Sequence, residues 1–336
     1  MSSVRLENIN KSFGSINALS NLNLEIKDGE FFVLLGPTGA GKTTTLRIIS
    51  GLEIPDSGNI FFNKEQYNNV QPAFRDTSYV FQQYSLYPHY SVYDNLAFPL
   101  RSPLRKSDKK TIDDRVLQIA RLLKIENKLN NKATQLSGGE MQRVSLGRAL
   151  VREPNIYLMD EPLSSLDAKL REELRVELKK IQTDLNATIL YVTHDQIEAT
   201  TMADRIGVLK EGVLTQVGTP QEIYEEPNSI YVANRLGSPK INILENKQIH
   251  NSQNSSASYV GIRPEDIKID QNGSYDVKIE TTELLGAETL VSFKSDTING
   301  ILLTQENINV GEGDKIKIDI NKSKILYFDN NEQRIV

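Results

Sequence analysis

Residues 31–43 read FFVLLGPTGAGKT, an apolar run followed by a loop rich in glycine. The loop fits the pattern G-x-x-x-x-G-K-[ST], in which backbone N–H groups turn inward around phosphates and a helix N-terminus adds partial positive charge. The apolar run is typical of a strand at 31–35, and residues 42–50 are typical of a helix closed by Gly51. Phosphate binding requires a strand, a loop and a helix in this order, so we prefer a phosphate site to a glycine-rich turn without a ligand.

Two side chains of this loop have distinct expected roles. We expect the Lys42 ammonium to reach the β- and γ-phosphates of a nucleotide, and the Thr43 hydroxyl to coordinate Mg²⁺. The predicted nucleotide contacts at the loop come from Gly36, Pro37, Thr38, Gly39, Ala40, Gly41, Lys42, Thr43 and Thr44.

A pair of carboxylates follows another apolar run, IYLM at 156–159. Asp160 can hold Mg²⁺ directly or through water, and Glu161 can orient or deprotonate the water that attacks the nucleotide. The alternative is an ordinary strand end with two solvated acids. The phosphate loop upstream favours the catalytic interpretation, because a nucleoside triphosphatase needs both parts.

Strand-like and helix-like segments alternate along most of the chain before residue 220. Further strands are expected at 22–26, 156–160, 188–193 and 205–210, a hairpin return at 214–217, and helices where apolar residues recur at helical spacing over 116–123 and 170–185. This alternation predicts a parallel sheet covered by helices.

The pattern of the sequence changes near residue 240. Residues 245–258 are polar and rich in Asn and Ser, which is typical of a linker or a long loop. Beyond them, apolar and polar residues alternate with period two at 277–280 and 315–320, which predicts a small all-β barrel or sandwich. We interpret the basic segment 101–110 as a solvated connection and not as a binding patch.

Composition narrows the classes of protein to which the chain can belong. A length of 336 residues suggests about two domains. With no Cys and only 3 His, neither a thiolate site nor a protein-built transition-metal site is expected, and a net charge of −5 gives no basic footprint for nucleic acid. The apolar runs are too short to span a bilayer and the N-terminus has no secretory signal, so we expect a soluble protein of the cytoplasm.

Residues 136–143 read LSGGEMQR, a Ser-Gly-Gly turn that opens a helix. Such a turn is a second anion site, for the same reasons as the first. The segment resembles the LSGGQ signature of ATP-binding-cassette (ABC) ATPases, with Glu140 where Gln is usual. The resemblance implies that Ser137 and Gly139 contact the γ-phosphate of ATP. It also implies an α/β fold, a P-loop NTPase domain of ABC type with a helical subdomain.

Four further residues match ABC motifs in the family's order. Phe13 resembles the aromatic residue that stacks on adenine, although a strand core residue is the alternative. Gln82 resembles the Q-loop glutamine, which links Mg²⁺ and water to the transmembrane partner, with Gln83 as the neighbouring alternative. Asp167 resembles part of the D-loop, which crosses to the other subunit at the nucleotide. His194 resembles the switch histidine that touches the γ-phosphate. The implied catalytic residues are then Lys42, Gln82, Glu161 and His194.

Segments outside these motifs resemble the importer-type ABC subfamily. They are QQYSLYPH at 82–89, GTPQEIY at 218–224, GSPKIN at 237–242 and GIRPED at 261–266. The last opens a region like the small, OB-like transport-associated domain of maltose- and multiple-sugar-importer ATPases. The resemblance implies an ATPase domain at 1–238, which includes helices at 219–237, and an all-β transport-associated domain at 239–336.

The subfamily implies a motor subunit that couples hydrolysis of ATP with Mg²⁺ to solute import, in a dimer that sandwiches two nucleotides. The implied partners are a second ATPase subunit, two transmembrane permease subunits and an extracytoplasmic solute-binding protein, at the cytoplasmic face of the membrane. The Gly-Ser-Pro and Asn of the 237–242 segment point to a carbohydrate, a polyol or glycerol phosphate as the solute.

Several alternatives remain at this stage. An importer of another small solute, such as a polyamine, iron or sulfate, would share the ATPase motifs. A soluble ABC ATPase of DNA repair or translation would show long heptads, a second cassette or a basic surface, and the sequence has none of these. A P-loop kinase or a switch GTPase would not need the signature, the D-loop or the switch histidine.

Overall fold

The structure is a computed structural model that describes residues 1–103, 107–249, 254–306, 308 and 310–335. Packing divides the chain into two compact units, Met1–Pro220 and Gln221–Val336. Within the described ranges, no helix has both the length and the apolar character that a membrane span demands.

A six-stranded sheet forms the centre of the first unit, in the order β10-β9-β3-β8-β7-β6. Its strands are β3 (Phe31–Leu35), β6 (Thr77–Val80), β7 (Ile156–Asp160), β8 (Ile189–Thr193), β9 (Arg205–Lys210) and β10 (Val213–Gly218). All neighbours pair in parallel except β10, which runs antiparallel beside β9. Every residue of β3, β7 and β8 is buried, as expected for parallel strands covered on both faces.

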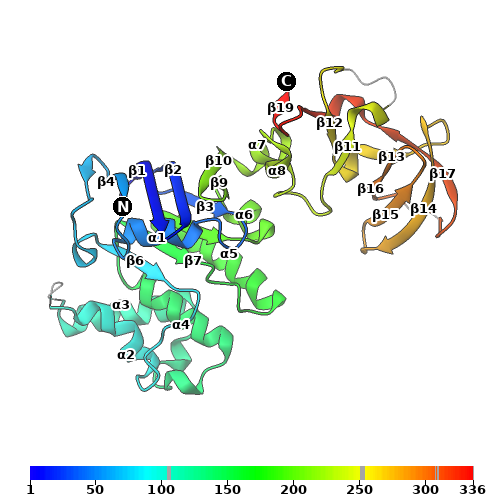
Figure 1. Cartoon of the computed structure of the whole chain (residues 1–336). Coiled ribbons are helices and arrows are strands. Elements are labelled where there is room, and N and C mark those ends of the chain that lie inside the picture. Colours follow the sequence, from blue (N-terminus) through cyan, green and yellow to red (C-terminus); the bar gives the residue numbers. More distant parts are fainter. Residues whose placement is uncertain (104–106, 250–253, 307, 309, 336) are drawn as a thin grey trace. The chain divides into compact units, whose positions relative to one another are not determined.

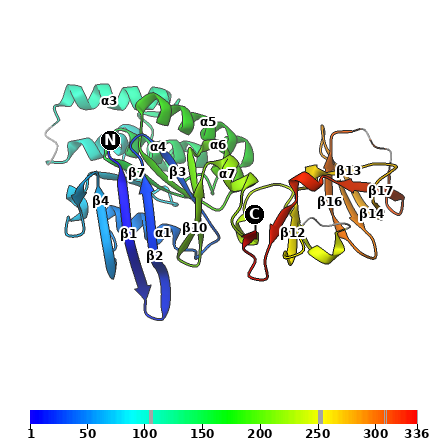
Figure 2. The ribbon, with the colours of Figure 1, turned by 90° about the horizontal axis from the view of Figure 1, so that it is seen from above.

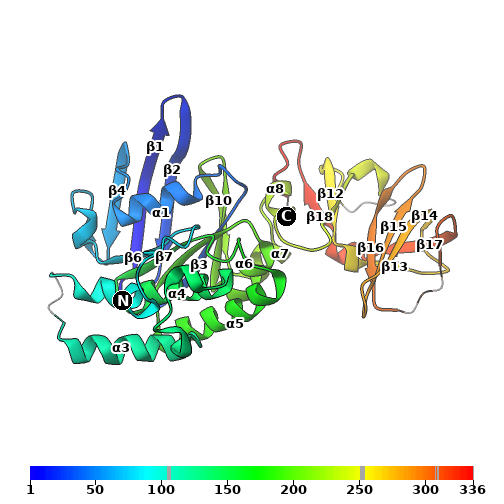
Figure 3. The same ribbon diagram turned by 90° about the horizontal axis from the view of Figure 1, so that it is seen from below.

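A second, antiparallel sheet of the first unit has the order β2-β1-β4-β5. Its strands are β1 (Val4–Phe13), β2 (Ile16–Ile26), β4 (Ser57–Phe62) and β5 (Glu65–Gln66). Helix α1 (Lys42–Ser50) contacts strands of both sheets and lies between them (Figure 3). Its apolar side chains Leu46, Ile48 and Ile49 belong to one core with residues of both sheets, so the helix after the phosphate loop is held on two sides.

The other helices of the first unit are α2 (Val92–Ala97), α3 (Lys109–Leu122), α4 (Gly138–Leu150), α5 (Ala168–Leu185) and α6 (Gln196–Met202). Helices α3 and α5 lie on the side of the central sheet away from β1 and β2 (Figures 2 and 3). Each buries the apolar stripe that helical spacing predicts, with Val116 and Ile119 on α3 and Leu174 and Leu178 on α5.

The second unit is built mainly of two antiparallel sheets, drawn in yellow to red in Figure 1. One has the order β11-β12-β18-β19 and the other β13-β17-β14-β15-β16. The strands are β11 (Asn242–Glu245), β12 (Tyr259–Ile262), β13 (Ile267–Ile269), β14 (Tyr275–Leu284), β15 (Thr289–Lys294), β16 (Asn299–Thr304), β17 (Lys315–Ile320), β18 (Leu326–Phe328) and β19 (Arg334–Ile335). Inward residues such as Val260, Ile279 and Ile318 form one core, and the predicted all-β C-terminal domain is confirmed.

Two short helices, α7 (Pro220–Glu225) and α8 (Ile230–Ala233), precede the first strand of this unit. Arg263 reaches back to them from the end of β12 and donates hydrogen bonds to the carbonyl oxygens of Tyr224, Ala233 and Leu236. Packing thus groups residues 221–237 with the C-terminal unit, whereas the sequence placed the boundary between 238 and 239. The Arg263 bonds join segments that are distant in the sequence, and the predicted boundary between 238 and 239 stays a prediction.

The structure confirms most of the predicted elements. The predicted bounds coincide with those of β3, β7, β9 and α1, and Gly51 closes α1 with a left-handed φ of 78°. Residues 250–253 of the predicted loop at 245–258 lie outside the described residues, as do residues 104–106 of the basic segment 101–110.

Candidate active site

The site forms where the carboxyl ends of neighbouring parallel strands meet. Leu35, the last residue of β3, pairs with Thr193 at the end of β8, and Asp160 at the end of β7 pairs with Val192. Because parallel strands end at the same edge, the loop after β3, the acids after β7 and His194 after β8 come together there. Sheet register therefore brings the loop at 36–43 together with acids and a histidine that lie more than a hundred residues later in the sequence.

The glycine-rich loop presents its backbone to this edge. Gly41 has φ 102°, and a Cβ there would lie 2.5 Å from the carbonyl oxygen of Ala18, so no other residue fits. Within the described residues, the N–H groups of Gly39, Gly41, Lys42, Thr43 and Thr44 donate no hydrogen bond. Unpaired N–H groups at the start of a helix form a cradle for an anion.

Lys42 is buried at the mouth of this cradle. Its ammonium donates to the carbonyl oxygens of Gly36, over 2.9 Å, and Pro37, over 3.1 Å. It also lies 3.3 Å from a carboxylate oxygen of Glu161. The Lys42 ammonium thus places a positive charge between the cradle and Glu161, the acid that is expected to act on water.

Thr43 and Asp160 form an oxygen-rich pair beside the cradle. The Thr43 hydroxyl donates to Asp160 Oδ1 over 3.0 Å, and the Tyr79 hydroxyl donates to Oδ2 over 3.0 Å. Burial raises the pKa of Asp160 above its ordinary value, and burial together with the Asp160 charge raises that of Tyr79. A buried carboxylate with a raised pKa gains from a cation, so this pair fits Mg²⁺.

The donor set also limits the kind of metal site that is possible. Across the described part of the chain, no group of three or more His, Cys, Asp or Glu residues could hold a metal ion alone. Mg²⁺ is commonly bound by one or two protein oxygens together with substrate phosphates, and Thr43 with Asp160 match that mode. The sequence predicted both residues, but not Tyr79, which reaches Asp160 from the adjacent strand β6.

Glu161 and His194 lie face to face across the strand ends. Glu161 adopts φ 45°, a left-handed conformation uncommon for its type, and its N–H donates to the carbonyl oxygen of Val192. His194 Nδ1 lies 3.0 Å from Glu161 Oε2, and 56% of the His194 side chain is exposed. The structure therefore brings together Lys42, Glu161 and His194, and their predicted catalytic roles stay predictions.

Gln82 is not brought to this cluster. It is exposed in the loop after β6, and none of the hydrogen bonds given for the described residues involves its side chain. Instead it lines a mainly apolar pocket of about 480 Å³ together with Tyr84, Met141 and Ser165. Its predicted contact with Mg²⁺ and water stays a prediction.

The signature turn forms a separate surface. Ser137 caps α4 by accepting from the N–H of Glu140, while the Glu140 carboxylate accepts from the Ser137 N–H over 2.9 Å. This backbone hydrogen bond and the Lys128 ammonium, 3.0 Å away, lower the pKa of Glu140. The spacing S-x-x-E is a sequence signal for such a capping box, so this use of the unusual Glu140 could have been predicted.

Gly139 and Asp167 meet at one residue of α5. A Cβ on Gly139 would lie 2.1 Å from a methyl carbon of Leu170, so the signature turn packs closely there. Asp167 caps α5 by accepting from the Leu170 N–H over 3.0 Å. Among the described residues, no hydrogen bond joins Ser137 or Gly139 to the loop at 36–43, and their predicted contact with phosphate stays a prediction.

Phe13 lies at the end of β1, where the strand pairs with Ile16 of β2. Its side chain is 46% exposed, and the Lys11 ammonium lies 5.1 Å from the ring centroid. The alternative that Phe13 is a strand core residue is therefore wrong, and the ring is free to stack on a planar ligand.

Family models match both units of the chain. The ABC transporter model matches residues 19–164, and the TOBE domain model matches residues 260–328. The sn-glycerol-3-phosphate import ATP-binding protein UgpC of Brucella abortus is 49% identical over 306 residues, which cover 87% of each chain. The trehalose/maltose import ATP-binding protein MalK of Thermococcus litoralis is 43% identical and covers 98% of each chain. The chain belongs to the ATP-binding subunits of ABC importers.

Solved structures agree with this assignment of the ABC subunit. A dimeric structure of MJ0796, a bacterial ABC transporter cassette, has a TM-score of 0.59 and 33% identity over 65% of this chain and 98% of its own. A dimeric post-hydrolysis state of MJ0796 bound to ADP and Pi has a TM-score of 0.58 and 34% identity. The fold prediction is confirmed, and the subunit is an ATPase whose hydrolysis of ATP drives import.

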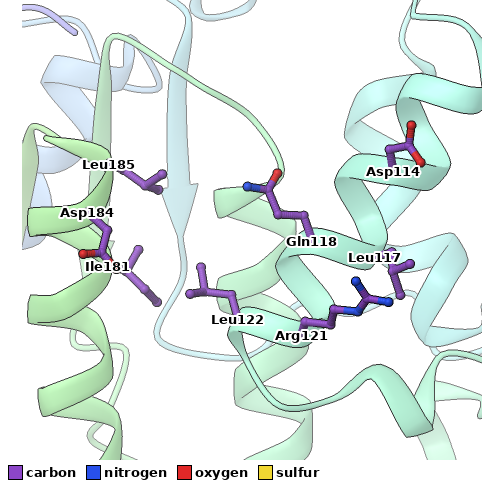
Figure 4. Close-up of a pocket in the computed structure, with 8 residues that line it drawn as sticks. All are labelled: Asp114, Leu117, Gln118, Arg121, Leu122, Ile181, Asp184 and Leu185. Carbon is purple, nitrogen blue, oxygen red and sulfur yellow. The ribbon is translucent and has the colours of Figure 1, made fainter.

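A further pocket of the ABC subunit lies away from these residues, between α3 and α5 (Figure 4). Its volume is about 700 Å³, Leu122 and Ile181 approach each other from the two helices, and Asp114 and Arg121 also line it. It includes none of the predicted site residues, so we assign it no part in the ATPase reaction.

Proposed function

We propose that this subunit hydrolyses ATP with Mg²⁺ bound at Thr43 and Asp160, as one half of a nucleotide-sandwich dimer attached to two permease subunits. The observation that carries the proposal is the convergence of the phosphate cradle, Lys42, the Thr43–Asp160 pair and the Glu161–His194 pair at one sheet edge. Mg²⁺ would neutralise charge that develops on the transferred phosphoryl oxygens. Gln82 would join this site when its loop moves toward Asp160.

Each residue of the cluster has a task that follows from its position. The N–H cradle and Lys42 would hold the phosphates and stabilise their charge. Glu161, acidic and close to the cradle, would orient or deprotonate the attacking water. His194, exposed and hydrogen-bonded to Glu161, would hold the Glu161 side chain before ATP binds and contact the γ-phosphate once ATP is bound.

A dimer follows from the separation of the two phosphate-binding surfaces. Among the described residues, Ser137 and Gly139 share no hydrogen bond with the loop at 36–43, and we infer that the signature meets the ATP bound at the loop of a second subunit. MJ0796, which resembles this chain in fold and sequence, forms dimers. Asp167, which caps α5 next to the signature, would lie at the subunit boundary.

The pocket beside Gln82 is a suitable permease contact. Its lining is mainly apolar, and it lies on an exposed loop that connects to β6 and thus to Asp160 through Tyr79. An apolar segment of a permease could bury this surface and sense the nucleotide site. The subunit would then sit at the cytoplasmic face of the membrane, with a solute-binding protein outside.

We infer that the solute is a carbohydrate, a polyol or glycerol phosphate. Relatives named as import proteins for sn-glycerol-3-phosphate and for trehalose/maltose support this class. Importers of polyamines, iron or sulfate are the alternative.

Uptake by cells that lack the gene tests the proposal. We expect loss of uptake of one of these solutes, recovery by the wild-type gene, and co-purification of the subunit with two hydrophobic partners from solubilised membranes. Unchanged uptake of all three classes would contradict the substrate proposal. Recovery of soluble partners alone would contradict the permease contact.

A further inference from the structure

The side chain of Tyr84, two residues after Gln82, connects three segments of the cassette. Its hydroxyl accepts a hydrogen bond from Ser165 Oγ over 3.2 Å. A Cβ built on Gly138 would lie 3.4 Å from the same hydroxyl oxygen, which is van der Waals distance. The Tyr84 hydroxyl thus bonds the loop after β6 to the loop before α5 and lies next to the signature turn.

The Ser165 side of this contact leads directly to the catalytic glutamate. The neighbouring residue Ser164 donates from its hydroxyl to the carbonyl oxygen of Glu161 over 2.9 Å, and its N–H bonds to the same oxygen over 3.2 Å. Glu161 has a left-handed backbone that few neighbouring arrangements support. Because Ser165 follows Ser164 in the chain, a shift of Ser165 would move Ser164 and so the carbonyl group of Glu161 to which Ser164 bonds.

A second residue holds the same loop to the signature helix. Arg148 of α4 donates to the carbonyl oxygen of Ser85, and its guanidinium carbon lies 4.8 Å from the centroid of the Tyr87 ring. Burial lowers the pKa of Arg148, and no carboxylate of the described residues forms an ion pair with it. Arg148 thus donates a hydrogen bond to a backbone carbonyl group of the loop after β6. This loop is bonded to α4 through Arg148 and to the loop before α5 through Tyr84.

We propose, on the basis of the function proposed above, that Tyr84 is a positioning residue that sets the Glu161 backbone through Ser165. In this arrangement the Tyr84–Ser165 hydrogen bond couples movement of the loop that carries Gln82 to movement of the loop before α5. Contact of a partner with the apolar pocket, which Tyr84 and Ser165 both line, would then change the rate of hydrolysis and not the affinity for ATP.

A double-mutant cycle on the full chain tests this coupling. We expect Tyr84→Phe and Ser165→Ala each to lower kcat by about threefold to tenfold, the range of one lost hydrogen bond, with KM for ATP unchanged. The double variant should be no slower than either single one, because both remove the same interaction. Tyr90→Phe is the matched control, since the same change in an exposed tyrosine of the same loop should leave kcat unchanged.

Three outcomes would overturn the coupling. They are multiplicative losses of kcat in the double variant, an unchanged kcat in Tyr84→Phe, and an equal loss of kcat in Tyr90→Phe. Unfolding midpoints of all variants within error of the wild type are expected, and a lowered midpoint in Tyr84→Phe would assign it a merely structural role. A wild-type chain with no ATPase activity would instead overturn the proposed function, and the inference with it.

Discussion

His194 Nδ1 lies 3.0 Å from Glu161 Oε2, so the two side chains are in direct hydrogen-bond contact. The same carboxylate lies 3.3 Å from the Lys42 ammonium through its other oxygen. Glu161 is therefore held on both sides by groups that can also bind a phosphate. A γ-phosphate entering the cradle would compete for Lys42 and His194, which would free the carboxylate to act on water.

Replacement of Glu161 by Gln should separate ATP binding from hydrolysis. The amide keeps the size of the side chain but cannot accept a proton, so we expect turnover to fall by about a hundredfold or more with ATP binding retained. Bound ATP that is not hydrolysed should hold two subunits together. Phosphate release and light scattering with ATP measure the two effects. Glu172→Gln, at an exposed position of α5, is the control, and near-normal hydrolysis by Glu161→Gln would contradict the assignment of the base.

Asp160→Asn should stabilise the nucleotide-free chain and abolish its activity. Because burial raises the folded-state pKa of Asp160, the carboxylate is harder to ionise in the folded than in the unfolded chain. The folded chain therefore binds the Asp160 proton more tightly than the unfolded chain does. This contribution to the free energy of unfolding is present at acid pH and is lost as pH rises through the raised pKa. We expect the variant to exceed the wild type in free energy of unfolding by about 0.5–1 kcal/mol at neutral pH.

Denaturant unfolding at acid and neutral pH tests the sign of this effect. The difference between Asp160→Asn and the wild type should shrink at acid pH, where Asp160 is protonated in both states. A difference that grows toward acid pH would contradict the raised pKa. Mg²⁺ with ATP should stabilise the wild type more than the variant, since the neutral amide of Asn attracts the metal less than the carboxylate of Asp160 does.

Phe13→Trp should report nucleotide binding directly, because the natural chain contains no Trp. If the exposed ring stacks on adenine, ATP should quench the fluorescence of this Trp and leave affinity near that of the wild type. Phe13→Ala should weaken ATP binding by about tenfold, within the range known for base stacking. Ile16→Trp, across the hairpin, is the control for general effects. Equal responses at both positions would contradict stacking at Phe13.

Much of the site could be predicted because its parts are local in sequence. The loop at 36–43 needs only a preceding strand, glycines at fixed positions and a following helix, and all three are contiguous. Asp160, Glu161 and His194 each end an apolar strand, so parallel pairing suffices to bring them to one edge.

The parts that could not be predicted depend on contacts distant in sequence. Tyr79 meets Asp160 because β6 is the neighbour of β7 in the sheet, an order that local patterns do not contain. Arg263 bonds to the segment that contains α7 and α8 across 27 to 39 residues of sequence, and the position of Gln82 depends on the conformation of its loop. Tertiary geometry determined each of these.

Arg263→Lys should destabilise the C-terminal unit while leaving ATP hydrolysis unchanged. Arg263 is buried, donates to three backbone carbonyl groups of the 221–237 segment and lies 3.8 Å from the ring centroid of Tyr224. Lys lacks the planar fork that makes these bonds together, so carbonyl groups are left unpaired. We expect a loss of about 2–3 kcal/mol from hydrogen bonds of a charged group.

Calorimetry of the full chain shows which of the two units Arg263→Lys destabilises. Because residues 221–237 pack with Arg263, the transition of the C-terminal unit should move to lower temperature while that of the ATPase unit stays. Arg235→Lys is the control, since Arg235 lies over the Tyr231 ring at 4.3 Å and should have a smaller effect. A shift of the ATPase transition alone would show that residues 221–237 belong with the first unit, as the sequence had suggested. KM and kcat for ATP should not change, because every residue of the proposed nucleotide site precedes residue 221.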